Sequence, residues 1–186
     1  MFYQQKLYDG VYQIWYTLFF ASQNKETKSS AHQRVRILLR KTRRIIMLVP
    51  MRAILDAADK NGYAQGAFNV NAVCQVKAAV DVHQILRSPA IIQGADLANG
   101  FMGGRTDFAN STLEDKKAGA KNIGAAVKKY AADSDIPVAL HLDHGKNFDS
   151  CIAAIEGGYT SVMIDGSSLP FDENVELTRE VVKYAH

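Results

Sequence analysis

The clearest hydrophobic pattern in the chain is the segment VALHLDHG, residues 138–145. Valine and leucine occupy positions 138, 140 and 142, which is the period of a β-strand. His141 and Asp143 therefore share the opposite face of this strand, and His144 stands where the strand gives way to glycine. Because parallel α/β proteins carry their chemistry at the carboxyl ends of their strands, this segment is the first candidate for a functional site.

The patterns on both sides of this segment predict that helices and strands alternate from Met47 onward. Apolar stripes at helical spacing take turns with short apolar runs bounded by glycine, asparagine or proline. The predicted helices are Met51–Lys60, Ala72–Leu86, Thr112–Ala132, Asn147–Glu156 and Asp172–His186. The predicted strands are Tyr63–Val70, Ser88–Gln93, Ile136–Asp143 and Thr160–Ile164. A long loop is expected over Gly94–Ser111.

This order of elements predicts an α/β fold with a parallel sheet. Strands separated by helices of this length pair in parallel through right-handed crossovers. The sequence contains no glycine-rich dinucleotide-binding fingerprint. Four βα units therefore predict about half of an eight-stranded (β/α)8 barrel, with a doubly wound sheet as the alternative. Half a barrel has two open sheet edges, so we expect the chain to be a fragment of a larger barrel.

The first 46 residues differ in composition from the rest. Aromatic side chains crowd residues 1–22, and arginines crowd residues 34–44. Three interpretations remain open for this leader. It is a basic amphipathic segment that contacts an anionic membrane or nucleic acid, a targeting presequence, or a stretch foreign to the native domain. The sharp change in composition favours the last, with the domain occupying residues 47–186.

Charge and hydropathy exclude several classes of function for the main part of the chain. Residues 1–46 hold nine Lys and Arg against two acids, whereas residues 47–186 hold thirteen against seventeen. This mild acidity argues against a nucleic-acid partner, and no apolar run approaches the roughly 20 residues of a membrane span. The two well-separated cysteines, Cys74 and Cys151, are typical of reduced thiols in a cytoplasmic protein.

Three long segments in this order resemble the class II fructose-bisphosphate aldolases, a family that includes tagatose-bisphosphate aldolases. They are YAQGAFNVN, VALHLDHG and SVMIDGSSLPFDENVELTREVVKYAH. The resemblance covers residues 47–186 and corresponds to the N-terminal half of the family's enzymes. It implies a (β/α)8 barrel, usually a homodimer or larger. It also implies zinc-dependent, reversible cleavage of fructose 1,6-bisphosphate into dihydroxyacetone phosphate and glyceraldehyde 3-phosphate.

The resemblance also implies roles for four residues. Asp143 matches the general acid/base that moves a proton at the C4 hydroxyl, and His144 matches the first ligand of the catalytic zinc. Asn69 matches an asparagine at the end of the first strand that contacts the substrate. Asp165 matches a carboxylate assigned to a second metal position, where a second divalent or monovalent cation would bind. These residue types suit the reaction, because zinc acts as a Lewis acid and a carboxylate exchanges the proton.

Several other polar residues are interpreted as structural. We interpret His141 as an interior or supporting histidine and not as a metal ligand. Judged from the residues alone, Asp165 is equally suited to capping the turn before Ser167. The lysines of residues 116–129 are interpreted as a solvated helix face, and Asp96 is given no binding role.

Two departures from the family pattern affect the expected activity. Ala95 stands where many members have a serine that contacts the aldehyde-side product, which leaves the choice between fructose and tagatose bisphosphate open. The family's later zinc histidines and phosphate-binding loops have no counterpart up to His186, and a catalytic zinc needs about three protein ligands. We therefore expect these 186 residues to be inactive alone. The alternative is a non-catalytic half-barrel that associates with another subunit.

Overall fold

The computed structural model describes residues 47–186, so the three interpretations of the leader lie outside the described residues. The strands are β1 Ala67–Asn69, β2 Ala90–Ala95, β3 Val138–Gly145 and β4 Ser161–Ile164. The helices are α3 Met51–Asn61, α4 Val73–Leu86, α5 Asp96–Met102, α6 Leu113–Ala132, α7 Phe148–Glu156 and α8 Phe171–Ala185, with a 3₁₀ turn at Phe108–Asn110. No helix within residues 47–186 is long and apolar enough to cross a membrane.

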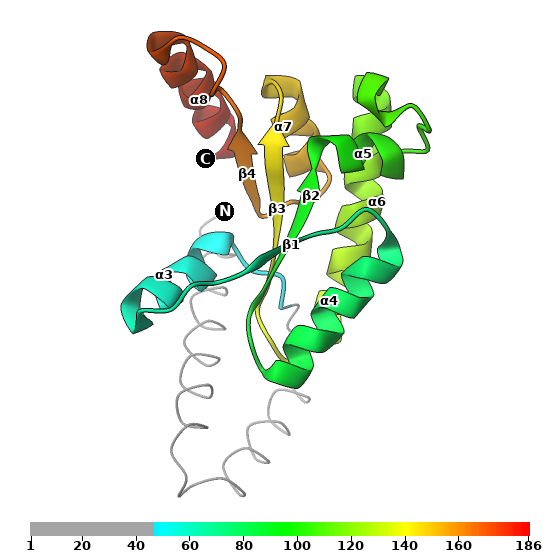
Figure 1. The fold of residues 1–186 in the computed structure, drawn as a ribbon, viewed down its shortest axis with the longest axis vertical. Helices are drawn as coiled ribbons and strands as arrows, with labels where there is room; N and C mark the ends of the chain where they lie inside the picture. The colour runs from blue at the N-terminus through cyan, green and yellow to red at the C-terminus, as the bar shows by residue number, and fades with distance from the viewer. Residues whose placement is uncertain (1–46) are drawn as a thin grey trace, which may run out of the picture.

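The four strands form one parallel sheet in the order β1-β2-β3-β4, which is also their order in the sequence (Figure 1). Helices α4, α6, α7 and α8 all contribute side chains to one core cluster with β2 and β3. A doubly wound sheet reverses its strand order and places helices on both faces. The sequential order and the placement of α4, α6, α7 and α8 on one face instead match consecutive units of a (β/α) barrel, which confirms the predicted fold class.

Strand β3 is buried on both faces for most of its length. Val138, Leu140 and Leu142 face the core formed with the helices, and each of them has no exposed surface. On the other face, Ala139 packs with Ile91, and helix α3 closes over them at the amino ends of the strands. Beyond Ala139 the same face carries His141 and Asp143. The apolar half of this face is therefore covered by α3, and its polar half points to the carboxyl end of the sheet.

The predicted strand Tyr63–Val70 is wrong in length and in burial. The strand is Ala67–Asn69, and all three of its residues are exposed. Within the described residues β1 pairs on one side only, with β2. An edge strand with a single partner needs few ladder hydrogen bonds and buries little surface, which an apolar run in the sequence does not reveal.

The loop predicted over Gly94–Ser111 contains helix α5 and the 3₁₀ turn, and β2 extends two residues further, to Ala95. Helix α5 forms because it packs closely on α6 at positions that hold glycine. A Cβ atom at Gly119 would lie 1.7 Å from the carbonyl oxygen of Asn99, and one at Gly103 would lie 1.9 Å from that of Asp115. This close approach depends on partners far apart in the sequence. The other predicted helices and strands are confirmed, with ends that coincide or are displaced by at most two residues.

We expect Gly124→Ala to destabilise the protein, because a Cβ atom there would lie 1.9 Å from the carbonyl oxygen of Gly157. Alanine favours a helix over glycine by about 1 kcal/mol, but forcing apart two packed backbones costs about 1–3 kcal/mol or more. The free energy of unfolding, measured by urea denaturation, should therefore fall.

The matched control is Ala125→Val, at the neighbouring exposed position on α6. We expect it to change the free energy of unfolding by only about 0.5 kcal/mol, through helix propensity. Equal stability of the Gly124→Ala variant and the unmodified protein would show that α6 and α7 are not in close contact here.

Candidate functional site

The structure brings the predicted site residues to one edge of the sheet. Asn69 ends β1, and Asp165 follows β4 directly. Asp143 and His144 lie near the carboxyl end of β3, just before its last residue, Gly145. Because the strands are parallel and paired in order, their carboxyl ends lie together (Figure 1). Asn69 is exposed at the outermost strand, two strands away from Asp143.

The imidazole of His144 lies between two carboxylates. Its Nδ1 atom is 2.7 Å from Oδ2 of Asp165, and its Nε2 atom is 3.7 Å from Oδ1 of Asp143. The backbone at His144 is in the left-handed region, with φ of 51°, where the pairing of β3 with β4 shifts register. Few residues other than glycine adopt this conformation. It turns the His144 side chain toward β4 and leaves 64% of it exposed.

The hydrogen bonds and charges around His144 and Asp165 indicate which ring nitrogen of His144 carries the proton. A hydrogen bond from the hydroxyl of Ser167 is the largest cause that lowers the pKa of Asp165, to about 2, and the bond with His144 adds to it. The hydrogen bond with Asp165 in turn raises the pKa of His144, and the charge of Asp143 acts in the same direction. Since an ionised carboxylate only accepts hydrogen bonds, Nδ1 of His144 must be the donor. In the neutral ring the lone pair is then on Nε2.

His141 occupies a different position from His144. Its Nδ1 atom lies 2.9 Å from the hydroxyl oxygen of Ser161 on β4, and burial lowers its pKa despite the opposing charge of Asp143. Burial on this face of the sheet thus favours the neutral form of the ring. This location agrees with the interpretation of His141 as an interior, supporting histidine.

Zinc fits only one part of this arrangement. An imidazole with Nδ1–H bound to a carboxylate and Nε2 free is the usual form of a zinc-binding histidine. However, the part of the chain that the structure describes has no group of three His, Cys, Asp or Glu side chains arranged to hold a metal ion. Asp165 is occupied as the partner of Nδ1. The described residues therefore offer one imidazole, that of His144, in the orientation that a metal ligand would need, and not a complete metal site.

Two serines support the site, and sequence reasoning missed one of them, Ser161. Ser161 binds His141 across the strands, and Ser167 donates to Asp165 from its backbone N–H at 3.1 Å and from its hydroxyl at 2.6 Å. The interpretation of Asp165 as the cap of a turn already involved Ser167, because an aspartate two residues before a serine often forms such a turn. Ser161 could be found only from the register that places it opposite His141.

Residues 49–186 are similar to proteins of a known family. The family described as class-II fructose-bisphosphate aldolase matches residues 49–186. The fructose-bisphosphate aldolase of Treponema pallidum is 41% identical over 141 residues, which are 75% of this chain and 39% of that protein. The 6-phospho-5-dehydro-2-deoxy-D-gluconate aldolase of Bacillus licheniformis is 38% identical over 139 residues, or 74% of this chain and 42% of that protein.

A solved structure agrees with these relatives. The crystal structure of the YdjI aldolase from Escherichia coli K12 superimposes with a TM-score of 0.59 and 28% sequence identity, covering 74% of this chain and 46% of that chain. The chain thus spans about two fifths of the length of the curated relatives it matches. The family match includes every strand of the sheet and all of the candidate site residues. The chain therefore belongs to the class-II fructose-bisphosphate aldolase family.

Proposed function

We propose that residues 47–186 contribute the proton-transfer residue and one zinc ligand to an aldolase that reversibly cleaves fructose 1,6-bisphosphate. One observation carries the proposal: Asp143 and His144 are adjacent at the carboxyl end of β3, and Asp165 orients the imidazole through Nδ1. Membership in the aldolase family supports the reaction type. The products would be dihydroxyacetone phosphate and glyceraldehyde 3-phosphate.

In this proposal Asp143 exchanges the proton of the C4 hydroxyl. Its carboxylate is on the inner face of β3, and 23% of its side chain is exposed, so a bound substrate can reach it. The carboxylate accepts the C4 proton during cleavage and returns it during condensation, as a general base and acid. Asn69, exposed at the end of β1, would contact the substrate near the reacting carbons.

His144 would hold the zinc ion through Nε2, while Asp165 keeps the ring in the tautomer that leaves this atom free. When bound, zinc supplies Lewis-acid polarisation of the substrate carbonyl. The main role of Asp165 in this proposal is to orient the imidazole of His144. A second role, as a ligand of a second divalent or monovalent cation, belongs to the same proposal. A catalytic zinc takes about three protein ligands, so further ligands must join His144.

The residue at position 95 bears on the choice between fructose and tagatose bisphosphate as substrate. Ala95 is paired in register with Asp143, so the methyl group stands beside the proton-transfer residue where a serine hydroxyl would contact substrate. Tagatose bisphosphate is therefore retained as the alternative substrate. The Bacillus licheniformis relative is named for a phosphorylated sugar acid and not for a ketose bisphosphate. This name indicates that aldolases with a similar half of the fold act on more than one substrate.

The remaining parts of the proposal concern the whole protein. The family match begins at residue 49, which supports a domain that begins near Met47 and leaves residues 1–46 outside it. The mildly acidic composition of residues 47–186 supports an enzyme without a nucleic-acid partner, the lack of a long apolar run in the sequence supports one without a membrane span, and the two separated cysteines support a cytoplasmic location. We propose a homodimer or larger assembly, as the family resemblance implies.

The function is tested with a chimaera in which residues 49–186 replace the matched segment of the Treponema pallidum aldolase. We expect zinc-dependent cleavage of fructose 1,6-bisphosphate. Asp143→Asn should lower kcat by a factor of about 10²–10⁴, the usual contribution of a general base.

The control is Asp149→Asn, an exposed aspartate in the first turn of α7, which should leave kcat unchanged. A chimaera whose kcat survives Asp143→Asn would contradict the assignment of the proton-transfer residue. Parallel assays with tagatose 1,6-bisphosphate decide between the two substrates.

We also expect the 186-residue chain alone to show no zinc-dependent cleavage, because the described residues complete no three-ligand metal site. The measurement is a coupled assay for dihydroxyacetone phosphate with Zn²⁺ in excess, with the chimaera as positive control. Turnover by the chain alone would refute this expectation and favour assembly of the site from several copies.

The pKa of His144, followed by NMR titration of the metal-free chain, should exceed the ordinary 6.5. Asp165→Asn should lower it, because the hydrogen bond to Asp165 is the largest cause of the shift. The stabilisation from protonated His144 is complete below pH 6.5 and is lost as pH rises through the higher folded pKa. That from ionised Asp165 is complete above pH 3.8 and is lost as pH falls toward about 2.

The pair should therefore stabilise the fold most between about pH 4 and 6.5. Asp149→Asn serves again as the control that leaves the His144 pKa in place. If Asp165→Asn leaves the pKa of His144 unmoved, Asp165 is not the partner of its ring.

A further inference from the structure

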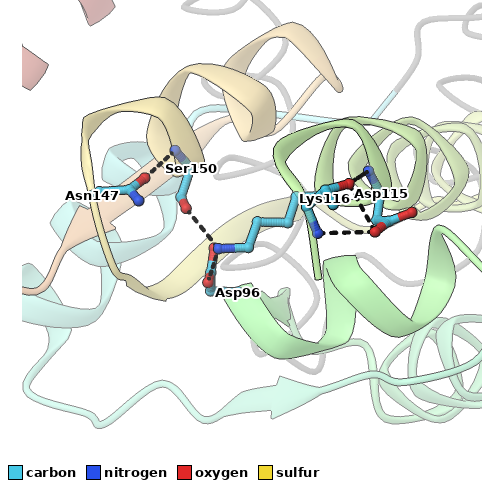
Figure 2. A network of polar contacts seen from close by, with 6 residues as sticks. Asp96, Asp115, Lys116, Asn147 and Ser150 are labelled. Carbon is cyan, nitrogen blue, oxygen red and sulfur yellow. Dashed lines mark hydrogen bonds and ion pairs between the residues drawn. The ribbon is translucent and has the colours of Figure 1, made fainter. Parts of the chain in front are cut away.

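A buried ion pair joins α5 to α6 (Figure 2). The ammonium nitrogen of Lys116 is 2.6 Å from Oδ2 of Asp96, and the two side chains are only 13% and 3% exposed. The interpretation of residues 116–129 as a solvated helix face is thus wrong for Lys116. The carboxylate of Asp96 is enclosed together with Lys116.

Lys116 also reaches the helix that follows the site. Its ammonium donates to the hydroxyl oxygen of Ser150 at 3.3 Å, and the backbone N–H of Ser150 donates to Oδ1 of Asn147 at 2.9 Å (Figure 2). Asn147 is the N-cap of α7 and lies three residues after His144. The Lys116 side chain therefore joins the first turns of α5, α6 and α7. Helix α5 follows β2 in the chain, and helix α7 follows β3.

The position of Lys116 is itself fixed by two local features of α6. Thr112 and Asp115 form a capping box just before it, in which each side chain binds the other residue's backbone N–H. One turn later, Gly119 allows α6 to approach α5. Because both ends of this segment are constrained, the ammonium has little freedom to leave the space between Asp96 and Ser150.

Stability alone does not account for this pair. Enclosing an ammonium and a carboxylate removes their hydration, and apolar residues of similar size are often equally stable in such places. Within residues 47–186, Oδ1 of Asp96 is moreover buried and accepts no hydrogen bond. The Lys116–Asp96 pair is therefore costly to bury and lacks one hydrogen bond. Such a pair suits a role in holding α5, α6 and α7 in one arrangement.

We propose that Lys116 is a positioning residue for the candidate site, which holds the segment after His144 at a fixed distance from the end of β2. This inference rests on the proposed function, because that function defines which side chains must be positioned. The segment between His144 and α7 is anchored at both ends. Gly145 accepts a hydrogen bond from the backbone N–H of Asp165 at 2.9 Å, and Asn147 is held through Ser150 and Lys116.

Gly145 packs closely against its neighbours on β3 and β4. A Cβ atom there would lie 2.8 Å from the Leu142 side chain and 2.9 Å from the carbonyl oxygen of Met163. A shift at the amino end of α7 would therefore be passed to His144 and to its hydrogen bond with Asp165. Lys116 acts through the backbone, because the residues within 47–186 to which its ammonium donates hydrogen bonds are Asp96 and Ser150.

The main test removes both charges together, in the variant Asp96→Asn/Lys116→Met of the full chain. Removing Lys116 alone would leave an unpaired buried carboxylate, whereas the double variant should keep its Tm within a few degrees. We expect amide hydrogen exchange of Gly145, Lys146 and Asn147 to accelerate about tenfold while the amides of α4 are unaffected. The Nδ1–H proton signal of His144 in the NMR spectrum should broaden or disappear.

Two further variants keep the inference decidable. Ser150→Ala leaves the ion pair intact and removes only the contact with α7, so it should accelerate exchange at residues 145–147 without a charge defect. Lys121→Met, at an exposed lysine on α6, is the matched control and should change neither readout.

The inference is overturned if exchange at residues 145–147 and the His144 signal are unchanged in the double variant, or in Ser150→Ala should the double variant not fold. These measurements involve neither zinc nor substrate. Failure of the chimaera to cleave fructose 1,6-bisphosphate would therefore overturn the proposed function without affecting this test.

Discussion

The arrangement of residues 47–186 depends on the burial of β3 on both faces. Leu140 and Leu142 require the helix layer on one side, and Ala139 requires α3 on the other. Strands β2 and β4 pair with the two edges of β3, and within residues 47–186 the side chains of β3 become accessible toward its carboxyl end. Asp143 and His144 occupy that end. The packing of the strand therefore decides where the chemistry can be.

The sequence predicted the parts of the fold that repeat with a regular period. The alternation in residues 138–142 was sufficient to locate β3 and to place His141 and Asp143 on one face. Helix α5 was missed because its stability comes from close contact with α6 at Gly103 and Gly119. The burial of Lys116 was missed for the same reason, since its partner Asp96 lies on another element and leaves no trace in helical periodicity.

The site was predicted as a set of residue types, and the structure supplies the contacts between them. Asp143 and His144 are neighbours in the sequence, so their proximity follows from the chain itself. The bond from His144 to Asp165 joins two strands and depends on the left-handed backbone of His144, which the HG dipeptide does not specify. The role of Ser161 similarly depends on strand register. Local patterns identify candidate side chains, whereas their orientation comes from pairing.

The two interpretations of Asp165, as the cap of a turn and as a residue of the site, are compatible because they use different oxygens. Oδ1 accepts the hydrogen bonds from Ser167, and Oδ2 accepts the one from His144. The turn therefore fixes the carboxylate in the position from which it orients the imidazole. A cation bound directly to Asp165 would have to share one of these oxygens or displace its donor. Since loss of the Oδ2 contact would free the imidazole, the geometry favours Asp165 as the support of His144 over Asp165 as an independent metal ligand.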